Sequence, residues 1–363
     1  MSDSPVPGAE SPKVLPSASQ FDQAQSFVTS EFDVEEALVE HGVPTFYVRL
    51  RPGSKHAFVK LVEKLSRIGL TPALRGRDGR KVIKVTPRPE MKPSRPVVNV
   101  VLLLITIATV SITGYFLSVG VEEYGVEPWV GAASFTIALL GILGAHEMAH
   151  KLAANHHSME ASLPYFIPGP PFLGIGTFGA VIIQKETAPN RDALFDIGAS
   201  GPIVGFIVAA FVSAIGLSMS HVEPVSEPFS GGLPISPLFL LLMNALVEAP
   251  GPGNYVVYLH PVAFAGWLGM FVTLLNLLPT GMLDGGHTLR SIINNDSARA
   301  VFTALSILIL LIMQQFLMLA LVLFLSMYKH PGPLDDVSKL SGKRKVMAAL
   351  LLVIFALCIF IPS

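Results

Sequence analysis

One stretch of the sequence reads Gly144-Ala145-His146-Glu147-Met148-Ala149-His150 and ends an apolar run that begins at Pro128. It contains the pattern H-E-x-x-H. Residues four apart share one face of a helix, so His146 and His150 can direct two imidazoles at a single metal ion. Glu147 is then placed to take a proton from a water molecule at that metal. Ionisable side chains are costly inside a membrane-length apolar segment, so we predict a catalytic metal site within a membrane.

The composition divides the chain into a basic part and an apolar part. Of its 363 residues, 51% are hydrophobic and only 14% are charged, against about 25% charged in a typical soluble domain. We predict a disordered tail over residues 1–20, a small basic soluble α+β domain over residues 21–95, and a polytopic α-helical membrane domain over residues 96–363. The single Cys358 excludes an internal disulfide and a cysteine-based zinc site.

The N-terminal domain is expected to combine helices and strands, with a ferredoxin-like arrangement as one possibility. The patterns predict a short helix over residues 33–41 that ends at Gly42, and a longer helix over residues 56–68. Strands are expected near residues 45–50, 72–74 and 81–85, with a turn over residues 77–80. The first ten residues have neither a basic region nor an apolar region typical of a secretory signal, so we expect this domain in the cytosol.

Positive charge is concentrated just before the membrane domain. Residues 43–95 contain 14 Lys and Arg against 3 Asp and Glu, a net charge of +11. This charge could hold the domain near anionic lipid headgroups, or it could be a solvated face that also signals topology. Nucleic-acid binding is not expected, because no aromatic platform or recognised nucleic-acid motif accompanies the charge.

The uncharged runs predict about six membrane crossings, since one crossing needs about 20 residues. They lie near residues 97–119, 128–153, 197–219, 261–283, 300–328 and 346–361. Loops 121–127 and 220–256 contain no Lys or Arg, whereas the loops that follow the second and fourth crossings do. The positive-inside rule therefore predicts a plasma-membrane protein whose N-terminal domain and active site face the cytosol.

Two segments do not fit a simple row of crossing helices. Residues 329–345 hold five Lys and Arg, yet six crossings would place them outside the cell. If residues 300–328, with Gln314-Gln315 at the middle, form a hairpin of two short helices, this loop returns to the cytosol. Residues 163–187 are apolar but broken by Pro and Gly, and residues 176–183 could form a strand that pairs with an extended peptide or a structural loop that packs on the bundle.

A catalytic zinc usually has three protein ligands, so the two histidines need a third. The candidates near the ends of crossings are Asp284, His287, His260, Asp192, Asp196 and Glu248. Asp284 follows a crossing that ends on the same side as the H-E-x-x-H motif, whereas His260 starts that crossing at the opposite side. From chemistry alone, His287 and Asp284 remain competing choices.

The second motif, Asn276-Leu-Leu-Pro279-Thr-Gly-Met-Leu-Asp284-Gly285, reads N-x-x-P-x-x-x-x-D-G. Together with H-E-x-x-H it resembles the zinc site-2 protease family of intramembrane metalloproteases, in the branch without a PDZ insertion. The resemblance covers roughly residues 97–330 and includes the small-residue segment 198–202. It implies one Zn²⁺ per chain, bound by His146, His150 and Asp284.

The resemblance also implies roles for the neighbouring residues. Glu147 would be the general base and Asn276 would assist at the substrate carbonyl, while Pro279 would break the helix and Gly285 would allow a close turn. The expected partners are membrane-spanning protein substrates and the lipid bilayer.

Two alternatives stay open, a transporter that relays ions through buried His, Glu and Asp, and a catalytically silent scaffold. The absence of an internal repeat argues against the first and the intact Glu147 against the second.

Overall fold

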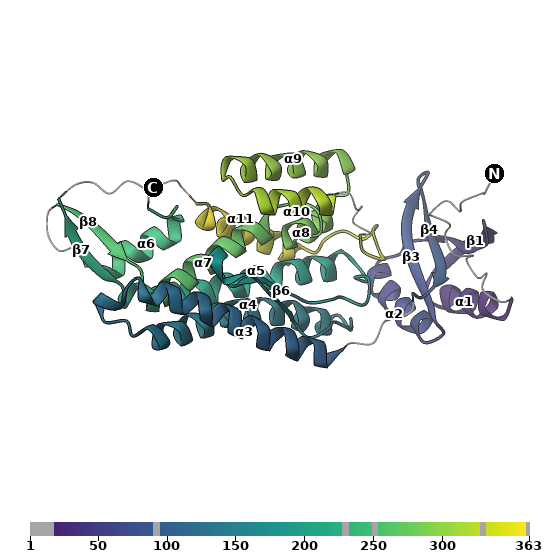
Figure 1. The fold of residues 1–363 in the computed structure, drawn as a ribbon. Helices are drawn as coiled ribbons and strands as arrows, with labels where there is room; N and C mark the ends of the chain where they lie inside the picture. Colours follow the sequence, from purple (N-terminus) through teal and green to yellow (C-terminus); the bar gives the residue numbers. More distant parts are fainter. Residues whose placement is uncertain (1–17, 90–94, 227–231, 249–252, 327–331, 361–363) are drawn as a thin grey trace, which may run out of the picture. The chain divides into compact units, whose positions relative to one another are not determined.

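The computed structural model describes residues 18–89, 95–226, 232–248, 253–326 and 332–360. The chain forms two compact units (Figure 1). The N-terminal unit contains residues 1–91 together with residues 189–191 and 333–339. The helical unit contains residues 92–188, 192–332 and 340–363.

The N-terminal unit is a four-stranded antiparallel sheet packed against two helices. Its elements are α1 (Ala18–Glu31), β1 (Asp33–Glu40), β2 (Val43–Arg49), α2 (Ser54–Ser66), β3 (Leu70–Arg77) and β4 (Arg80–Pro87). The strand order is β1-β2-β4-β3. Apolar side chains of both helices and of the sheet bury one another, among them Val28, Phe46, Phe58, Leu61 and Ile83. The chain order αββαββ differs from the βαββαβ order of a ferredoxin-like fold, so that expectation was wrong.

The predicted helix over residues 33–41 is also wrong, because this segment is strand β1. His41 and Gly42 have φ angles of 49° and 79°, and they form the two-residue turn of a hairpin that pairs Glu40 with Val43. Two consecutive positive φ values are typical of the tight turn whose twist matches a β-hairpin. Gly42 therefore ends a hairpin turn rather than a helix. The prediction of a disordered tail over residues 1–20 is wrong for the last three residues, because α1 begins at Ala18. Residues 1–17 lie outside the described residues.

A segment from the C-terminal part of the chain extends the sheet of the N-terminal unit. Leu74 of β3 donates its N–H to the carbonyl of Leu334 at 2.9 Å, and the N–H of Asp336 donates to the carbonyl of Leu74 at 3.2 Å. Leu334 is buried in the core of the unit. Asp335 is fully buried, and its Oδ1 accepts the N–H groups of Val337 and Ser338, each at 2.9 Å. The edge strand β3 is thus covered by the chain itself.

Among the described residues, the helical unit contains long apolar helices, two pairs of short strands and two single helical turns. Its helices are α3 (Pro96–Val119), α4 (Pro128–His156), α5 (Arg191–Ser218), α6 (Pro237–Leu246), α7 (Pro261–Leu277), α8 (Asp284–Ile292), α9 (Asp296–Ile312), α10 (Phe316–Ser326) and α11 (Gly342–Cys358). Strands β5 (Tyr165–Pro168) and β6 (Thr177–Val181) pair, as do β7 (His221–Val225) and β8 (Asn254–Tyr258). Single turns η1 (Glu122–Tyr124) and η2 (Pro171–Leu173) complete the unit.

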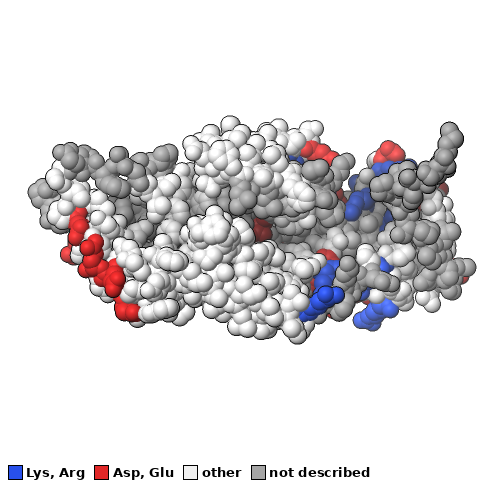
Figure 2. Space-filling model, viewed as in Figure 1, with Lys and Arg blue, Asp and Glu red and all other residues white. Residues whose placement is uncertain are grey.

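Three of these helices, α3, α4 and α5, are long and apolar enough to cross a membrane. Figure 2 shows a broad uncharged surface over the middle of the helical unit, with acidic residues gathered at the end near β7. Apolar side chains such as Leu104, Phe116 and Ile137 are exposed in the helical unit, as lipid-facing residues would be. The fourth and sixth predicted crossings contain α7 and α11, which have 17 residues each.

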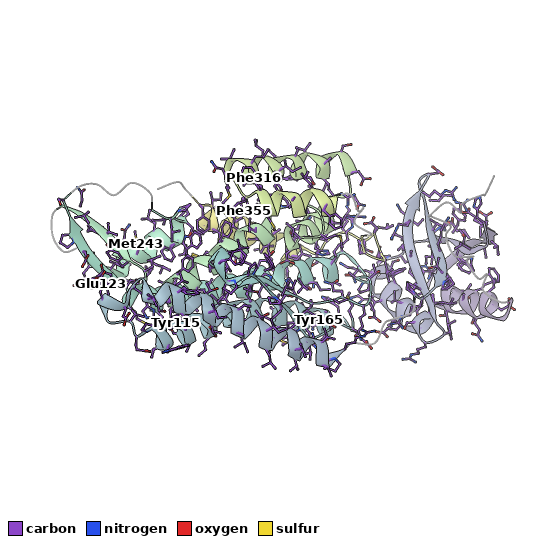
Figure 3. The ribbon with its side chains drawn as sticks, in the orientation of Figure 1. Tyr115, Glu123, Tyr165, Met243, Phe316 and Phe355 are labelled. Carbon is purple, nitrogen blue, oxygen red and sulfur yellow. The ribbon has the colours of Figure 1, made fainter. Side chains whose placement is uncertain are left out.

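The fifth predicted crossing, residues 300–328, is not one helix. It is divided into α9 and α10, which contact one another and lie side by side as a helical hairpin (Figure 1). Gln314 has a φ of 54° and reverses the chain between them. Figure 3 labels Phe316 at the start of α10 and Phe355 on α11, and Phe355 packs against the apolar cluster formed by α9 and α10. The polar Gln314-Gln315 pair therefore marks a chain reversal, as the hairpin alternative required.

Small residues let the central helices of the helical unit approach closely. α4 packs against both α3 and α7. α5 and α7 also lie close together. Gly216 of α5 faces the backbone of Ala263 on α7, and Gly266 of α7 faces Ser213 of α5, with no room for a Cβ atom at either glycine. Glycine and serine at helix contacts allow such close packing in membranes, where the hydrophobic effect does not drive helix association.

We predict that Asp335→Ala loosens the segment that covers β3. The substitution removes two buried hydrogen bonds, which costs about 1–2 kcal/mol of local stability. In the full chain, thermolysin should then cut within residues 333–339 about 5–30-fold faster, as mapped by mass spectrometry. Lys339→Ala is the control, because its side chain is exposed and its carbonyl, which accepts a hydrogen bond from Lys55, is retained. Equal cutting rates in the two variants would contradict the prediction.

Candidate metal centre

Helix α4 brings His146, Glu147 and His150 into the interior of the helical unit. All three side chains are buried. The two histidines lie one turn apart on one face, and their Nε2 atoms are 3.1 Å from each other. Two ring nitrogens this close cannot both carry a proton that points at the other. The pair is therefore arranged to direct lone pairs at a common point.

A break between α7 and α8 brings Asp284 to the same point. α7 ends at Leu277, Leu278 and Pro279 leave the helical conformation, and α8 begins at Asp284. A Cβ atom on Gly285 would lie 2.3 Å from the carbonyl oxygen of Leu277, so only glycine permits this fold of the start of α8 onto the end of α7. The turn places the Asp284 carboxylate beside the two imidazoles.

The three side chains form a compact triangle of ligand atoms. Asp284 Oδ2 lies 3.1 Å from His146 Nε2 and 3.2 Å from His150 Nε2. Ligands about 2.0–2.1 Å from a tetrahedral zinc ion lie about 3.3 Å from one another. Among the described residues, these three form the group of His, Cys, Asp or Glu side chains that could hold a metal ion. Two imidazoles and one carboxylate fit a zinc ion that keeps one position open.

Helix α5 fixes the orientation of His150. Nδ1 of His150 lies 2.7 Å from the carbonyl oxygen of Ile197. A carbonyl oxygen only accepts, so Nδ1 carries the proton and Nε2 is left with a lone pair that faces Asp284 and His146. A metal-binding histidine commonly donates its second nitrogen in this way.

The same helix leaves space for the metal through its glycines. A Cβ atom on Gly201 would lie 2.1 Å from His150 Nε2 and 2.7 Å from His146 Nε2. A zinc ion binds imidazole nitrogen at about 2.0–2.1 Å. Because Gly201 has no Cβ atom, the space beside the two Nε2 atoms stays free at about this distance. Gly205 similarly faces His146, at 2.8 Å from Nδ1. This contact was not predicted from the sequence, although the spacing of Gly198, Gly201 and Gly205 on one helix face could have indicated it.

Two further side chains from the motifs lie at the ligand triangle or next to it. Nδ2 of Asn276, on α7, is 3.3 Å from His146 Nε2. Glu147 follows His146 directly, and its carboxylate accepts a hydrogen bond from the backbone N–H of Ile182, which comes just after β6. An amide donor and a carboxylate are therefore both close to the point that the three ligand atoms face.

The other candidate ligands are not part of the triangle. His287 lies one turn after Asp284 on α8 and is half-buried, and its Cβ faces Gly198. His260 caps the start of α7 and accepts the N–H of Val262 at 3.2 Å. Asp192 and Asp196 form ion pairs with Arg344, and Glu248 is exposed. The structure thus brings together Asp284 and the two motif histidines and leaves these five residues outside the group.

Comparisons with known proteins agree with this arrangement. A family model described as peptidase family M50 matches residues 134–320, a little over half of the chain. "Probable zinc metalloprotease EGY1, chloroplastic" from Arabidopsis thaliana is 35% identical over 172 residues, which cover 45% of this chain and 30% of that protein. "Probable zinc metalloprotease EGY3, chloroplastic" from Oryza sativa subsp. indica is 29% identical over 294 residues, which cover 72% of this chain and 47% of that protein. The chain therefore spans less than half the length of these relatives. No solved structure matches it.

We predict that Gly201→Ala prevents metal binding. The new methyl group would lie 2.1 Å from His150 Nε2, so the imidazole must move away from the ligand triangle. Metal affinity, measured by competition with a chelator, should fall at least about 100-fold. Gly141→Ala is the matched control, since it adds the same group to a membrane helix at a position with no atom within 4 Å. Normal affinity in Gly201→Ala would show that the metal does not bind between these helices.

The identity of the third ligand can be tested by replacing each of the two candidates on α8, Asp284 and His287, with alanine. Asp284→Ala should abolish stoichiometric metal binding, because it removes one of three ligands, whereas His287→Ala should retain most of the metal. Metal content of the purified variants is measured by mass spectrometry. The opposite result would assign the third position to His287.

Proposed function

The chain belongs to peptidase family M50, the site-2 protease family, and we propose that it is a membrane-embedded zinc endopeptidase that cleaves transmembrane segments of other proteins. One observation carries the proposal. His146, His150 and Asp284 place three ligand atoms within 4.8 Å of one another inside a unit of apolar helices, with Glu147 adjacent. A buried acid and two buried histidines in such surroundings are expected only where they have a function.

His146, His150 and Asp284 are the proposed ligands of one zinc ion. When bound, zinc would polarise the scissile carbonyl and make a water molecule acidic enough to react near neutral pH. The ligands supply one negative charge, from Asp284, so the site keeps a net positive charge that attracts electron-rich carbonyl oxygen. The hydrogen bond from His150 to Ile197 keeps the ligand geometry in place during the reaction.

Glu147 and Asn276 are the proposed catalytic residues. Glu147 would accept the proton of the attacking water and pass it to the departing amine, which is the role of the glutamate in H-E-x-x-H peptidases. Its hydrogen bond from Ile182 orients the carboxylate without neutralising it. Asn276 would donate its amide N–H to the oxygen of the scissile carbonyl as negative charge develops there. Its position 3.3 Å from a ligand atom supports this role.

Strand β6 is the proposed guide for the substrate. A peptide bond inside a helix has its carbonyl occupied, so a transmembrane substrate must unwind locally before it can be cut. β6 pairs with β5 along one edge, and the described residues provide no strand partner for its other edge. Ile182, directly after β6, contacts Glu147, so a segment that pairs with this edge would be led to the metal centre.

The hairpin that contains β6 is held firmly on α3. Asn99 of α3 donates to the carbonyls of Leu163 and Pro164, both at 2.9 Å, and Thr109 donates to the carbonyl of Gly176 at 2.7 Å. Gly176 has a φ of 76°, and a Cβ atom there would lie 2.7 Å from the carbonyl of Thr109. Such backbone is tolerated at membrane depth when protein buries it, and here the carbonyls of Leu163, Pro164 and Gly176 are paired with side chains of α3.

The proposed orientation in the membrane rests on the charges of the loops. We propose about six crossings, or seven if α9 and α10 each cross, with the N-terminal unit and the metal centre toward the cytosolic side of the plasma membrane. The basic face of the N-terminal unit would lie near anionic headgroups, with the bilayer and membrane-spanning substrates as partners. The loop charges support this orientation, since residues 121–127 and 220–256 contain no Lys or Arg.

We predict that Glu147→Gln abolishes cleavage but keeps the metal. The amide has nearly the size of the carboxylate but cannot take a proton, so the cleavage rate should fall by about 10²–10⁴-fold or more. Wild-type and variant protein, purified in detergent, are compared on a membrane-anchored test substrate, and bound zinc is measured in both.

The controls for this experiment separate the possible functions. Glu160→Gln makes the same chemical change at a carboxylate that is exposed and outside the metal centre. Equal cleavage by wild type and Glu147→Gln, or wild-type protein that binds no stoichiometric metal, would reject the protease. Metal without cleavage in the wild type would instead favour a silent scaffold or an ion-handling protein.

A further inference from the structure

A cluster of charged side chains that includes no proposed metal ligand lies in the helical unit where α4 ends and where α5 and α11 begin. Nε of Arg344 donates to Asp196 Oδ1 at 2.7 Å, a second guanidinium nitrogen bonds the other oxygen of Asp196, and Nη1 pairs with Asp192 Oδ2 at 3.0 Å. Nε2 of His157, the residue that directly follows α4, lies 2.8 Å from Asp196 Oδ2. The Arg344, Asp192, Asp196 and His157 side chains are only 12–22% exposed.

The cluster is more than a surface ion pair, because Arg344 makes a two-point contact and two of its partners, Asp192 and Asp196, come from another helix, α5. Arg344 also donates to Ser341 Oγ at 2.8 Å, and the N–H of Ser341 donates to Asp192 Oδ1 at 3.0 Å. Planar two-point pairing of arginine with a carboxylate fixes the relative orientation of both groups. The start of α11 is thereby fastened to the first turns of α5.

Asp196 is joined directly to the residue that orients a metal ligand. The next residue, Ile197, offers its carbonyl oxygen to Nδ1 of His150 at 2.7 Å. Asp192 and Asp196 are four residues apart, so their two negative charges share one helix face and repel unless a cation lies between them. Arg344 supplies that cation. Without it, the repulsion between Asp192 and Asp196 would act on the turn of α5 that carries the Ile197 carbonyl.

We propose that Arg344 is a positioning residue of the metal centre. Through Asp196 it holds the carbonyl of Ile197 against Nδ1 of His150, and so keeps Nε2 of His150 directed at the metal. The proposal rests on the proposed function, since it assumes that the three ligands bind zinc. Helix α11 contributes no metal ligand, but through Arg344 it would help to position the ligand His150.

The test compares Arg344→Gln with Lys343→Gln in the purified full-length protein. Lys343 is exposed and adjacent, so the control makes the same substitution and the same loss of charge. Zinc affinity is measured by competition with a chelator, and the ligand geometry is followed by the visible spectrum of the cobalt(II)-substituted protein. Thermal unfolding of the metal-free proteins reports any purely structural effect.

We expect zinc affinity about 10–100-fold weaker in Arg344→Gln and an altered cobalt spectrum, with wild-type behaviour in Lys343→Gln. Arg344→Lys keeps the charge without the two-point contact and should lie between them. Wild-type affinity and spectrum in both Arg344 variants would overturn the proposal, even if the metal-free protein unfolds at a lower temperature. If Arg344→Gln does not fold, Arg344→Lys decides alone by the same criteria. If the wild type itself binds no metal, the failure belongs to the proposed function instead.

Discussion

The helical unit is organised by one requirement, that three ligand atoms from distant parts of the chain meet within about 3 Å inside apolar surroundings. His146 and His150 come from one helix, and Asp284 comes from a helix start more than 130 residues later. A buried carboxylate is costly unless cations or donors compensate it. Three other features of the unit allow the ligand atoms to lie this close: the break after α7, the glycines of α5 and the carbonyl of Ile197.

Glycine positions decide how closely the helices approach. Gly201 and Gly205 allow α5 to lie against both imidazoles, and Gly285 allows α8 to fold against the end of α7. A single methyl group at Gly201 would fill the space beside the ligand nitrogens. In a membrane, helices gain little from burying apolar surface against each other, so such close contacts and the hydrogen bonds they permit carry much of the specificity.

Much of the metal centre could be predicted from the sequence, because short motifs contain most of its side chains. The spacing of His146 and His150 indicated two ligands on one helix face, whereas Asp284 as the third ligand was implied only by the resemblance that the second motif carries. The polar Gln314-Gln315 pair indicated that a hairpin of two short helices, here α9 and α10, could replace one crossing helix. Contacts that depend on tertiary structure were not visible, such as the carbonyl of Ile197 behind His150. Residues 33–41 were misread because a positive φ at Gly42 suits both a helix end and a hairpin turn.

The central claim is that two imidazoles and one carboxylate bind a single zinc ion. X-ray absorption at the zinc edge of the purified wild-type protein measures the kind, number and distance of the atoms around the metal. We expect one zinc per chain with about four nitrogen or oxygen neighbours at about 2.0–2.1 Å, outer-shell scattering from two imidazoles and no sulfur. A zinc-free protein, sulfur in the first shell, or scattering from a single imidazole would contradict it.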